Sequence, residues 1–311
     1  MKVVPLYKET GYETGKLIAI DEVSWFIGEA ILSGMLLEVA SYPKPGLVSA
    51  VSQGAHRDMN ILTFMVSSSA ISSSFPRFSQ LGFDYKGNIK NLLPRIRDLG
   101  VLYEKKLLDA TDNVNTQRGI LFSGGILAAA AGFCYGRDIN AGLGDIFDTV
   151  AALTEGIVKD ELVSAGLERC RDLTCGEILF VKYGTTGIRG EVEKGFPSVA
   201  GKGIPAIKEA VSYGTKLNDC LVHALISLMT VVEDTTILWR KDPETLATVK
   251  ERALEIIDSG SVFTVSGRNK IRKTNDDFIR EGISPGGAAD LLSITLSSFI
   301  LENKRLPVLK M

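Results

Sequence analysis

The chain has 311 residues, of which 45% are hydrophobic and 23% charged, and its net charge is −2. This composition is typical of a soluble globular protein, and the near-neutral charge excludes a generally basic surface for non-specific nucleic-acid binding. The four cysteines form no C-x-x-C pair, and the first residues have no apolar segment of the secretory kind. We therefore expect reduced, buried thiols in a cytoplasmic protein.

Helical periodicity dominates the chain. Apolar residues recur every three or four positions after Asp21, a good N-cap, and again over residues 146–157. The apolar runs 119–136 and 221–232 carry almost no charge. The first is rich in Gly and Ala and the second is too short to cross a bilayer, so both are predicted to be buried helices and no membrane association is expected.

Later helix boundaries are marked by capping residues. Asp242 followed by Pro243 predicts a helix start, and that helix should end near Gly260. Ser284-Pro285 predicts another start by the same pattern. The best strand signal, residues 262–265, is isolated, so there is no alternation of strands and helices of the kind that forms Rossmann or P-loop nucleotide sites.

The predicted fold is therefore all-α. We expect a single compact multi-helix domain over residues 1–311, with its core at about 20–301. The glycine-rich stretch 183–205 is the least helical long segment, and we expect it to form an active-site loop. The glycine-rich helices are also compatible with packing against a second copy of the chain in a homo-oligomer.

Polar segments interrupt the apolar helices at four places. Asp58 precedes an apolar run, where it either caps a helix or serves a metal or catalytic role. Arg118 opens the Gly/Ala-rich helix, where it either binds phosphate in bidentate fashion or belongs to a solvated turn. Arg189 and Glu191 flank Gly190 and either pair with each other or divide the work, with Arg on phosphate and Glu on a metal or proton.

The fourth polar region has two parts. Glu233 and Asp234 follow a buried helix, where two carboxylates are unfavourable unless a cation such as Mg²⁺ binds them or the turn is exposed. Gly286 and Gly287 open a helix, which indicates close approach of either an anionic ligand or a neighbouring helix. The lone His223 lies within an apolar run and is interpreted as a packed core residue.

Taken together, these segments resemble the triphosphoribosyl-dephospho-CoA synthase family, which makes the prosthetic-group precursor of citrate lyase and malonate decarboxylase. The resemblance rests on five ordered motifs: KPGLV at 44–48 with GAHRDM at 54–59, NVNTQRG at 113–119, TGIRGE at 186–191 with GFPSV at 195–199, EDT at 233–235, and SPGGAAD at 284–290. Five motifs in order are far more specific than any one of them. The family is all-helical.

The resemblance implies a reaction between ATP and 3′-dephospho-CoA. The ribose 2′-hydroxyl of dephospho-CoA attacks the anomeric carbon of the ATP ribose, adenine leaves, and the triphosphate stays on the transferred sugar. Such a displacement at a sugar carbon should pass through an oxocarbenium-like transition state, and it needs a carboxylate, a donor to adenine and cations for the phosphates. ATP and dephospho-CoA would be the partners, with Mg²⁺ as the cofactor.

We assign candidate roles by residue type and motif position. The general base is expected to be Glu191, with Asp58 as second candidate, and Asp290 is expected to hold a metal-bound water or the ribose. The metal candidates are Glu38, Glu233 and Asp234, with Asp58 as a further possibility. The other substrate-binding candidates are Lys44, His56, Arg57, Asn115, Arg118, Arg189, Ser284, Gly286 and Gly287.

The chain departs from the family pattern at three places. Gln117-Arg118 stands where relatives usually carry His-Lys, so a histidine proton shuttle is excluded there. Thr236 replaces a usual Asn, and Lys241 replaces a usual Gly. Two alternatives therefore stay open at this point: the same ribosyl chemistry on another acceptor, such as one of a pterin pathway, or a non-catalytic ATP-binding protein.

Overall fold

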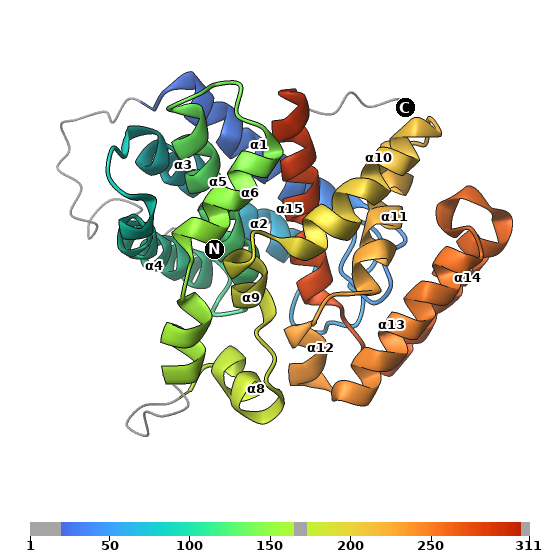
Figure 1. Cartoon of the computed structure of the whole chain (residues 1–311). Helices are drawn as coiled ribbons and strands as arrows, with labels where there is room; N and C mark the ends of the chain where they lie inside the picture. The colour runs from blue at the N-terminus through green and yellow to red at the C-terminus, as the bar shows by residue number, and fades with distance from the viewer. Residues whose placement is uncertain (1–19, 165–172, 306–311) are drawn as a thin grey trace.

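The computed structural model describes residues 20–164 and 173–305, and within these ranges every regular element is helical. The all-α prediction is thereby confirmed, and the helices form one domain (Figure 1). The elements are α1 (Glu22–Ala40), α2 (Ile61–Ile71), α3 (Ser74–Asp84), η1 (Ile89–Asn91), α4 (Leu93–Ala110), α5 (Arg118–Tyr135), α6 (Leu143–Leu153), η2 (Val158–Val163), α8 (Cys175–Tyr183), α9 (Gly187–Glu193), η3 (Val199–Gly203), α10 (Ile204–Ser212), α11 (Leu217–Met229), α12 (Thr235–Arg240), α13 (Pro243–Asp258), η4 (Ser261–Phe263), α14 (Val265–Glu281) and α15 (Gly286–Asn303).

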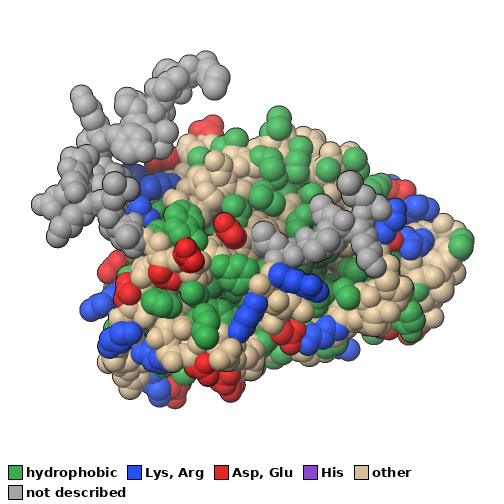
Figure 2. Space-filling view, turned by 90° about the horizontal axis from the view of Figure 1, so that it is seen from above, with side chains coloured by type: hydrophobic (Ala, Val, Ile, Leu, Met, Phe, Trp, Pro, Cys, Tyr) green, Lys and Arg blue, Asp and Glu red, His purple; other side chains and the backbone are tan. Residues whose placement is uncertain are grey.

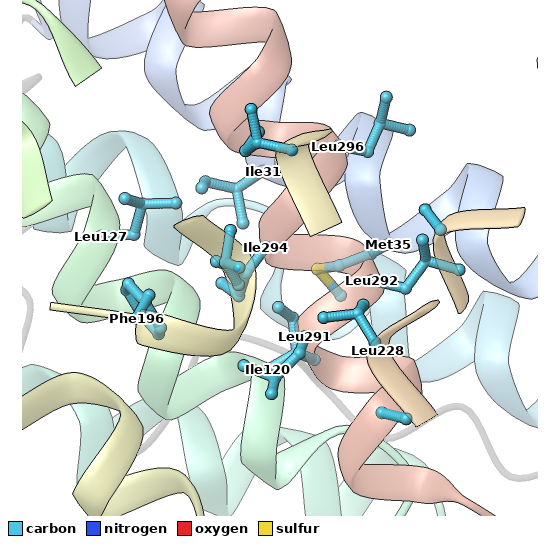
Figure 3. Close-up of a cluster of buried hydrophobic side chains, with 14 of the residues drawn as sticks. Ile31, Met35, Ile120, Leu127, Phe196, Leu228, Leu291, Leu292, Ile294 and Leu296 are labelled. Atoms are coloured by element: carbon cyan, nitrogen blue, oxygen red, sulfur yellow. The ribbon is translucent and has the colours of Figure 1, made fainter. Parts of the chain in front are cut away.

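Helix α15 lies at the centre of the domain, in contact with α1 and α5 on one side and α11 on the other (Figure 1). Its side chains Leu291, Leu292 and Ile294 are buried among those of the surrounding helices (Figure 3). Gly34 of α1 faces α15 so closely that an added Cβ would collide with the carbonyl of Ser293. The first and last long helices of the described chain are therefore packed backbone to backbone.

The glycines of α5 are used for packing within the chain. A Cβ on Gly132 would collide with the backbone of Ser79 in α3, and one on Gly125 would lie 2.9 Å from the ring of Phe78. Helices α1 and α5 are long and apolar enough to cross a membrane by composition, but α5 is 78% buried inside the domain. The prediction of a buried helix is confirmed, and these glycines serve helix α3 rather than a second copy of the chain.

Capping residues set several boundaries where the sequence predicts them. The Asp21 side chain accepts a hydrogen bond from the Ser24 amide at 2.9 Å, and Asp242 accepts one from the Thr245 amide at 2.7 Å. The isolated strand signal at 262–265 does not form a strand. Residues 261–263 form the 3-10 helix η4, and Thr264 caps α14, accepting from the Gly267 amide at 3.0 Å.

The stretch 183–205 forms helices rather than one long loop. It contains α9, η3 and the start of α10, separated by short turns. Gly187 and Gly195 adopt positive φ angles of 52° and 69° in those turns. The glycines therefore permit tight connections between short helices, which a composition-based reading cannot distinguish from a loop.

The predictions for the cysteines are confirmed only in part. Cys134 and Cys220 are buried and unbridged as predicted, Cys175 is exposed, and Cys170 lies outside the described residues. His223 is packed in the core as interpreted, with its ring nitrogens 2.8 Å from Ser261 Oγ and 3.1 Å from a Glu209 oxygen. On the face drawn in Figure 2, positive and negative side chains are interspersed.

Candidate active site

A cavity of about 620 Å³ lies where the ends of several helices meet. All five motifs that the sequence analysis identified contribute to its wall, although they are far apart in the chain. The contributing segments are 38–64, 115–120, 175–197, 231–240 and 284–293. Catalytic and ligand-binding sites commonly form in such a concave region where helix ends converge.

Eleven of the fifteen predicted site residues line this cavity. They are Glu38, His56, Asp58, Asn115, Arg118, Glu191, Glu233, Ser284, Gly286, Gly287 and Asp290. The other four lie elsewhere: Lys44 and Asp234 are buried within the wall, Arg57 is exposed, and Arg189 faces a neighbouring cavity. Most of the candidates are therefore brought together, but not all of them can touch a bound ligand directly.

Lys44 forms a buried ion pair with Glu38. The Lys44 side chain is 1% exposed, and its ammonium contacts Glu38 Oε1. Burial raises the pKa of Glu38 and lowers the pKa of Lys44, while their mutual attraction opposes both shifts. Because the ammonium reaches Glu38 rather than the cavity surface, Lys44 acts on the site through that carboxylate.

Asp234 is bonded to the backbone of two helices. It caps α12 by accepting from the Thr236 and Ile237 amides at 3.0 and 3.2 Å, and it reaches across to the Ala288 amide at 2.9 Å. The Gly287 amide is a fourth donor. Burial raises the pKa of Asp234, and these N–H donors counter that effect. The adjacent carboxylates at 233–234 therefore differ, since Glu233 faces the cavity and Asp234 joins α12 to α15.

The two glycines of α15 are explained largely by this junction. An added Cβ on Gly286 would lie 2.8 Å from Thr236 Oγ1, and one on Gly287 would lie 3.1 Å from the Asp234 carboxylate. Of the two explanations for these glycines, close approach of a neighbouring helix is the one the geometry supports. The predicted Ser284 cap is wrong, since α15 begins after Pro285 and Ser284 makes no cap hydrogen bond.

Asp290 has the opposite surroundings. Within residues 20–164 and 173–305, the Asp290 carboxylate has no hydrogen-bond partner. It lies against Gly119 at the start of α5, so closely that a Cβ added to Gly119 would collide with it. Burial first, and then the charges of Glu38 and Asp234, raise the pKa of Asp290 well above its ordinary value. A carboxylate kept in this environment without a donor is suited to binding a cation or holding a proton.

His56, Asp58 and Arg240 form a polar group at another side of the cavity. His56 Nε2 lies 2.7 Å from Ser284 Oγ, and its buried Nδ1 has no hydrogen-bond partner in the described structure. Burial and the Arg240 charge lower the pKa of His56, so the ring is neutral near pH 7. Asp58 does not cap α2, because Asn60 does so in a capping box with Thr63. Asp58 instead lies 4.0 Å from Arg240.

Glu191 faces the cavity from α9. Ser198 donates to both of its carboxylate oxygens, from Oγ at 2.5 Å and from the amide at 3.2 Å. Burial raises the pKa of Glu191, and the bonds from Ser198 oppose that shift. Ser198 therefore orients the Glu191 carboxylate, and burial makes this carboxylate more basic than that of a solvated Glu. Both properties are those of a general base.

Arg189 and Glu191 do not pair. Side chains two residues apart on a helix point to nearly opposite faces. Glu191 faces the cavity, whereas Arg189 is directed away from it and donates a hydrogen bond to Glu161 at 2.5 Å. Arg118 does line the cavity, with 47% of its side chain exposed, and it pairs with Glu104. Exposed pairs of this kind are weak, which leaves Arg118 able to exchange Glu104 for a phosphate.

Trp239, Arg240 and Lys194 also line the cavity, and the sequence analysis predicted no role for them. Trp239 is 50% exposed and lines the cavity beside Arg240, and Lys194 lies near Glu191, where its charge lowers that carboxyl's pKa. Their position directly after the acidic motif is the sequence feature from which Trp239 and Arg240 could have been predicted to lie at the site. Lys194 is at the C-cap of α9, which sequence reasoning treated as loop.

The predicted metal candidates are not clustered. Across the described ranges, no three His, Cys, Asp or Glu side chains are grouped so as to hold a metal ion by themselves. Glu38 and Asp290 nevertheless both face the cavity and interact electrostatically. Two carboxylates completed by substrate phosphates is an arrangement typical of Mg²⁺, which rarely uses an all-protein cage.

Comparison with known proteins agrees with the motif resemblance. A "Probable 2-(5''-triphosphoribosyl)-3'-dephosphocoenzyme-A synthase" of Malonomonas rubra is 44% identical over 287 residues, covering 92% of this chain and 91% of the relative. The corresponding synthase of Klebsiella pneumoniae is 35% identical, covering 87% of this chain and 89% of the relative. A probable synthase of Pectobacterium carotovorum is also 35% identical, covering 86% and 87%.

No solved structure matches the chain. The model of one protein family matches residues 24–307, a range that includes every segment of the cavity wall. The match, the relatives and the convergence of the five motifs on one cavity lead to the same conclusion. The chain belongs to the CitG family, described as ATP:dephospho-CoA triphosphoribosyl transferases.

Proposed function

We propose that the protein transfers the triphosphoribosyl group of ATP to the 2′-hydroxyl of 3′-dephospho-CoA, and that the reaction takes place in the 620 Å³ cavity. The hydroxyl oxygen forms a bond to the anomeric carbon of the ATP ribose as the bond between that carbon and adenine breaks. Adenine leaves with the bonding electron pair and a proton, while the triphosphate chain stays intact. The family name and the relatives' names support both substrates.

One observation carries this proposal. The cavity brings a half-buried, oriented carboxylate, Glu191, together with basic groups and the start of α5. Helix α5 has no side-chain cap and residues 118–120 of its first turn line the cavity, so N–H groups without a cap are available to an anion there, where Arg118 adds a full positive charge. A site of this kind binds a polyphosphate at one end and presents a base at the other.

Glu191 is proposed to receive the proton of the attacking hydroxyl. Its raised pKa makes it a stronger base than an exposed Glu, and Ser198 fixes its orientation. Its negative charge also stabilises the positive charge that develops on the ribose in an oxocarbenium-like transition state. Lys194 and Arg240 add positive charge to the cavity wall for the phosphates.

The residues present fit a Mg²⁺ ion. We propose Glu38 and Asp290 as its protein ligands, because the Asp290 carboxylate has no hydrogen-bond donor in the described structure and faces the cavity beside Glu38. A bound Mg²⁺ would supply charge that brings the triphosphate to this carboxylate-lined wall. Lys44 keeps the Glu38 carboxylate oriented from behind.

The test is incubation of the protein with ATP, MgCl₂ and dephospho-CoA, followed by chromatography and mass spectrometry. We expect free adenine and an acceptor enlarged by one triphosphoribosyl group. The matched control is the 2′-deoxy analogue of dephospho-CoA, which lacks the attacking hydroxyl and should give no enlarged product. Formation of ADP or AMP in place of adenine would contradict the proposal, and adenine release only with a different acceptor would redirect it.

A further inference from the structure

A second cavity of about 320 Å³ lies next to the first, between α4, α5 and the η2–α9 region. Its wall is largely apolar. The apolar side chains are Phe78, Leu93, Ile96, Val101, Leu121, Phe122 and Ile126. None of the roles assigned above uses this space.

The rim of this cavity is charged. Arg97 and Arg189 each bond one oxygen of Glu161, so a single carboxylate is shared by two guanidinium groups. Arg118 pairs with Glu104 at the same rim. Three arginines therefore face two glutamates, which leaves a net positive edge around an apolar floor.

Arg118 lines both cavities. The two spaces are therefore adjacent at this guanidinium, and a long ligand can extend from one to the other past it. Protein cavities of about 300–1,000 Å³ usually hold one drug-sized ligand. A cavity of 620 Å³ suits ATP with the reacting ribose of the acceptor, but leaves the rest of a second nucleotide to be placed outside it.

We propose that the second cavity binds the pantetheine arm of the acceptor, an inference that rests on the proposed function. The arm combines a branched apolar carbon chain with amide groups, and it is joined to the acceptor nucleoside through a diphosphate. The apolar floor matches the arm, and the positive rim matches the diphosphate. The acceptor ribose then lies in the first cavity, on the Glu191 side.

In this arrangement Arg189 contacts the acceptor diphosphate, and Arg118, at which the two cavities meet, lies between this diphosphate and the ATP triphosphate. Both belong to ion pairs at partly exposed side chains, 47% exposed for Arg118 and 26% for Arg189, and such pairs are easily exchanged. The placement also explains why Arg189 points away from the first cavity although it lies in the same motif as Glu191. The two residues serve the two ends of one acceptor.

The decisive variant is Gly100→Leu. Gly100 lines the second cavity from within α4, and an added Cβ there meets nothing within 4 Å, so Leu can be accommodated and also favours the helix. We expect the KM for dephospho-CoA to rise at least tenfold and the KM for ATP to change less than twofold. The matched control is Gly144→Leu, a helical glycine with equally open surroundings that lines neither cavity, and it should behave as the unmodified protein.

A shortened acceptor separates this inference from general damage. ADP carries the acceptor ribose and diphosphate without the arm, and we use it as acceptor and as inhibitor. Its kinetic constants should be the same for Gly100→Leu and the unmodified protein. Equal dephospho-CoA kinetics in the two proteins, or equal losses with dephospho-CoA and ADP, would overturn the inference. Absence of adenine release by the unmodified protein would instead refute the proposed function.

Discussion

Two aspartates at the site, the buried Asp234 and the half-buried Asp290, both have a raised pKa but have opposite surroundings. Asp234 accepts from four backbone N–H groups of α12 and α15. Asp290 has no donor in the part of the chain that the structure describes, and the charges of Glu38 and Asp234 act on it. One carboxylate is committed to the fold, while the other faces the cavity.

The comparison shows how a structural and a chemical carboxylate differ in physical terms. A carboxylate that satisfies backbone donors contributes to stability, since its loss leaves buried N–H groups without acceptors. A carboxylate next to like charges reduces stability unless a cation or proton compensates. Glu191 lies between these cases, because Ser198 bonds it but its carboxylate still lines the cavity.

The largest expected effect is that of Glu191→Gln. Removing a general base typically costs about 100- to 10,000-fold in rate, so adenine release should fall by that range while the unfolding temperature changes little. In the unmodified protein, activity should appear only as pH rises through the raised pKa of Glu191, because the base must be deprotonated.

Ser198→Ala provides the matched variant for this pH profile. Ser198 lowers the pKa of Glu191, so its loss should move the acidic limb of kcat/KM to higher pH. An acidic limb that stays in place in Ser198→Ala, together with full activity of Glu191→Gln, would exclude Glu191 as the base and leave Asp58 as the next candidate.

Asp234→Ala should have the next largest effect, on stability. Four backbone donors lose their acceptor at the α12–α15 junction, and we expect a loss of about 3 kcal/mol in the free energy of unfolding. Urea denaturation followed by circular dichroism measures it. An unchanged midpoint would show that the comparison between the two aspartates is mistaken.

Asp290→Asn should have the smallest effect, and it should raise the stability that Asp234→Ala lowers. The raised pKa means that the folded protein holds a proton which the unfolded chain releases above about pH 4, so stability falls as pH rises from there towards the folded pKa. Without this group, the variant should be more stable by about 1 kcal/mol or more at pH 8, and this gain should disappear towards pH 4.

Thermal unfolding of Asp290→Asn and the unmodified protein across that pH range measures the difference. A variant that is less stable at pH 8 would mean that Asp290 has a hydrogen-bonding role in the fold. Adding MgCl₂ should stabilise the unmodified protein more than the variant, which also tests the proposed ligand.

The sequence predicts helix boundaries well where a single local signal decides them. Asp21 and Asp242 cap helices as expected, since each lies directly before a helical pattern with no competing cap nearby. Asp58 fails as a cap because Asn60, two residues later, bonds the first-turn amides and Thr63 completes the capping box. Capping is therefore predictable only when neighbouring candidates are weighed against one another.

The proximity of the candidate residues was more predictable than their individual contacts. Eleven of the fifteen candidates that the motifs indicated line one cavity. The roles of Asp234 and Arg189 depend on partners distant in the chain, namely backbone amides of α15 for Asp234 and Glu161 for Arg189. One sequence contains no signal for such long-range contacts, and a helical segment read as a loop hides which face a side chain occupies.

The central position of α15 has a consequence for synthesis of the protein. Helix α1 packs on α15, and the cavity wall includes residues from both, so the earliest and latest long helices must meet before a binding site exists. A growing chain cannot form this site until α15 has left the ribosome. Binding of nucleotide can therefore stabilise only completed molecules, and chains that stop before α15 should be exposed to proteolysis.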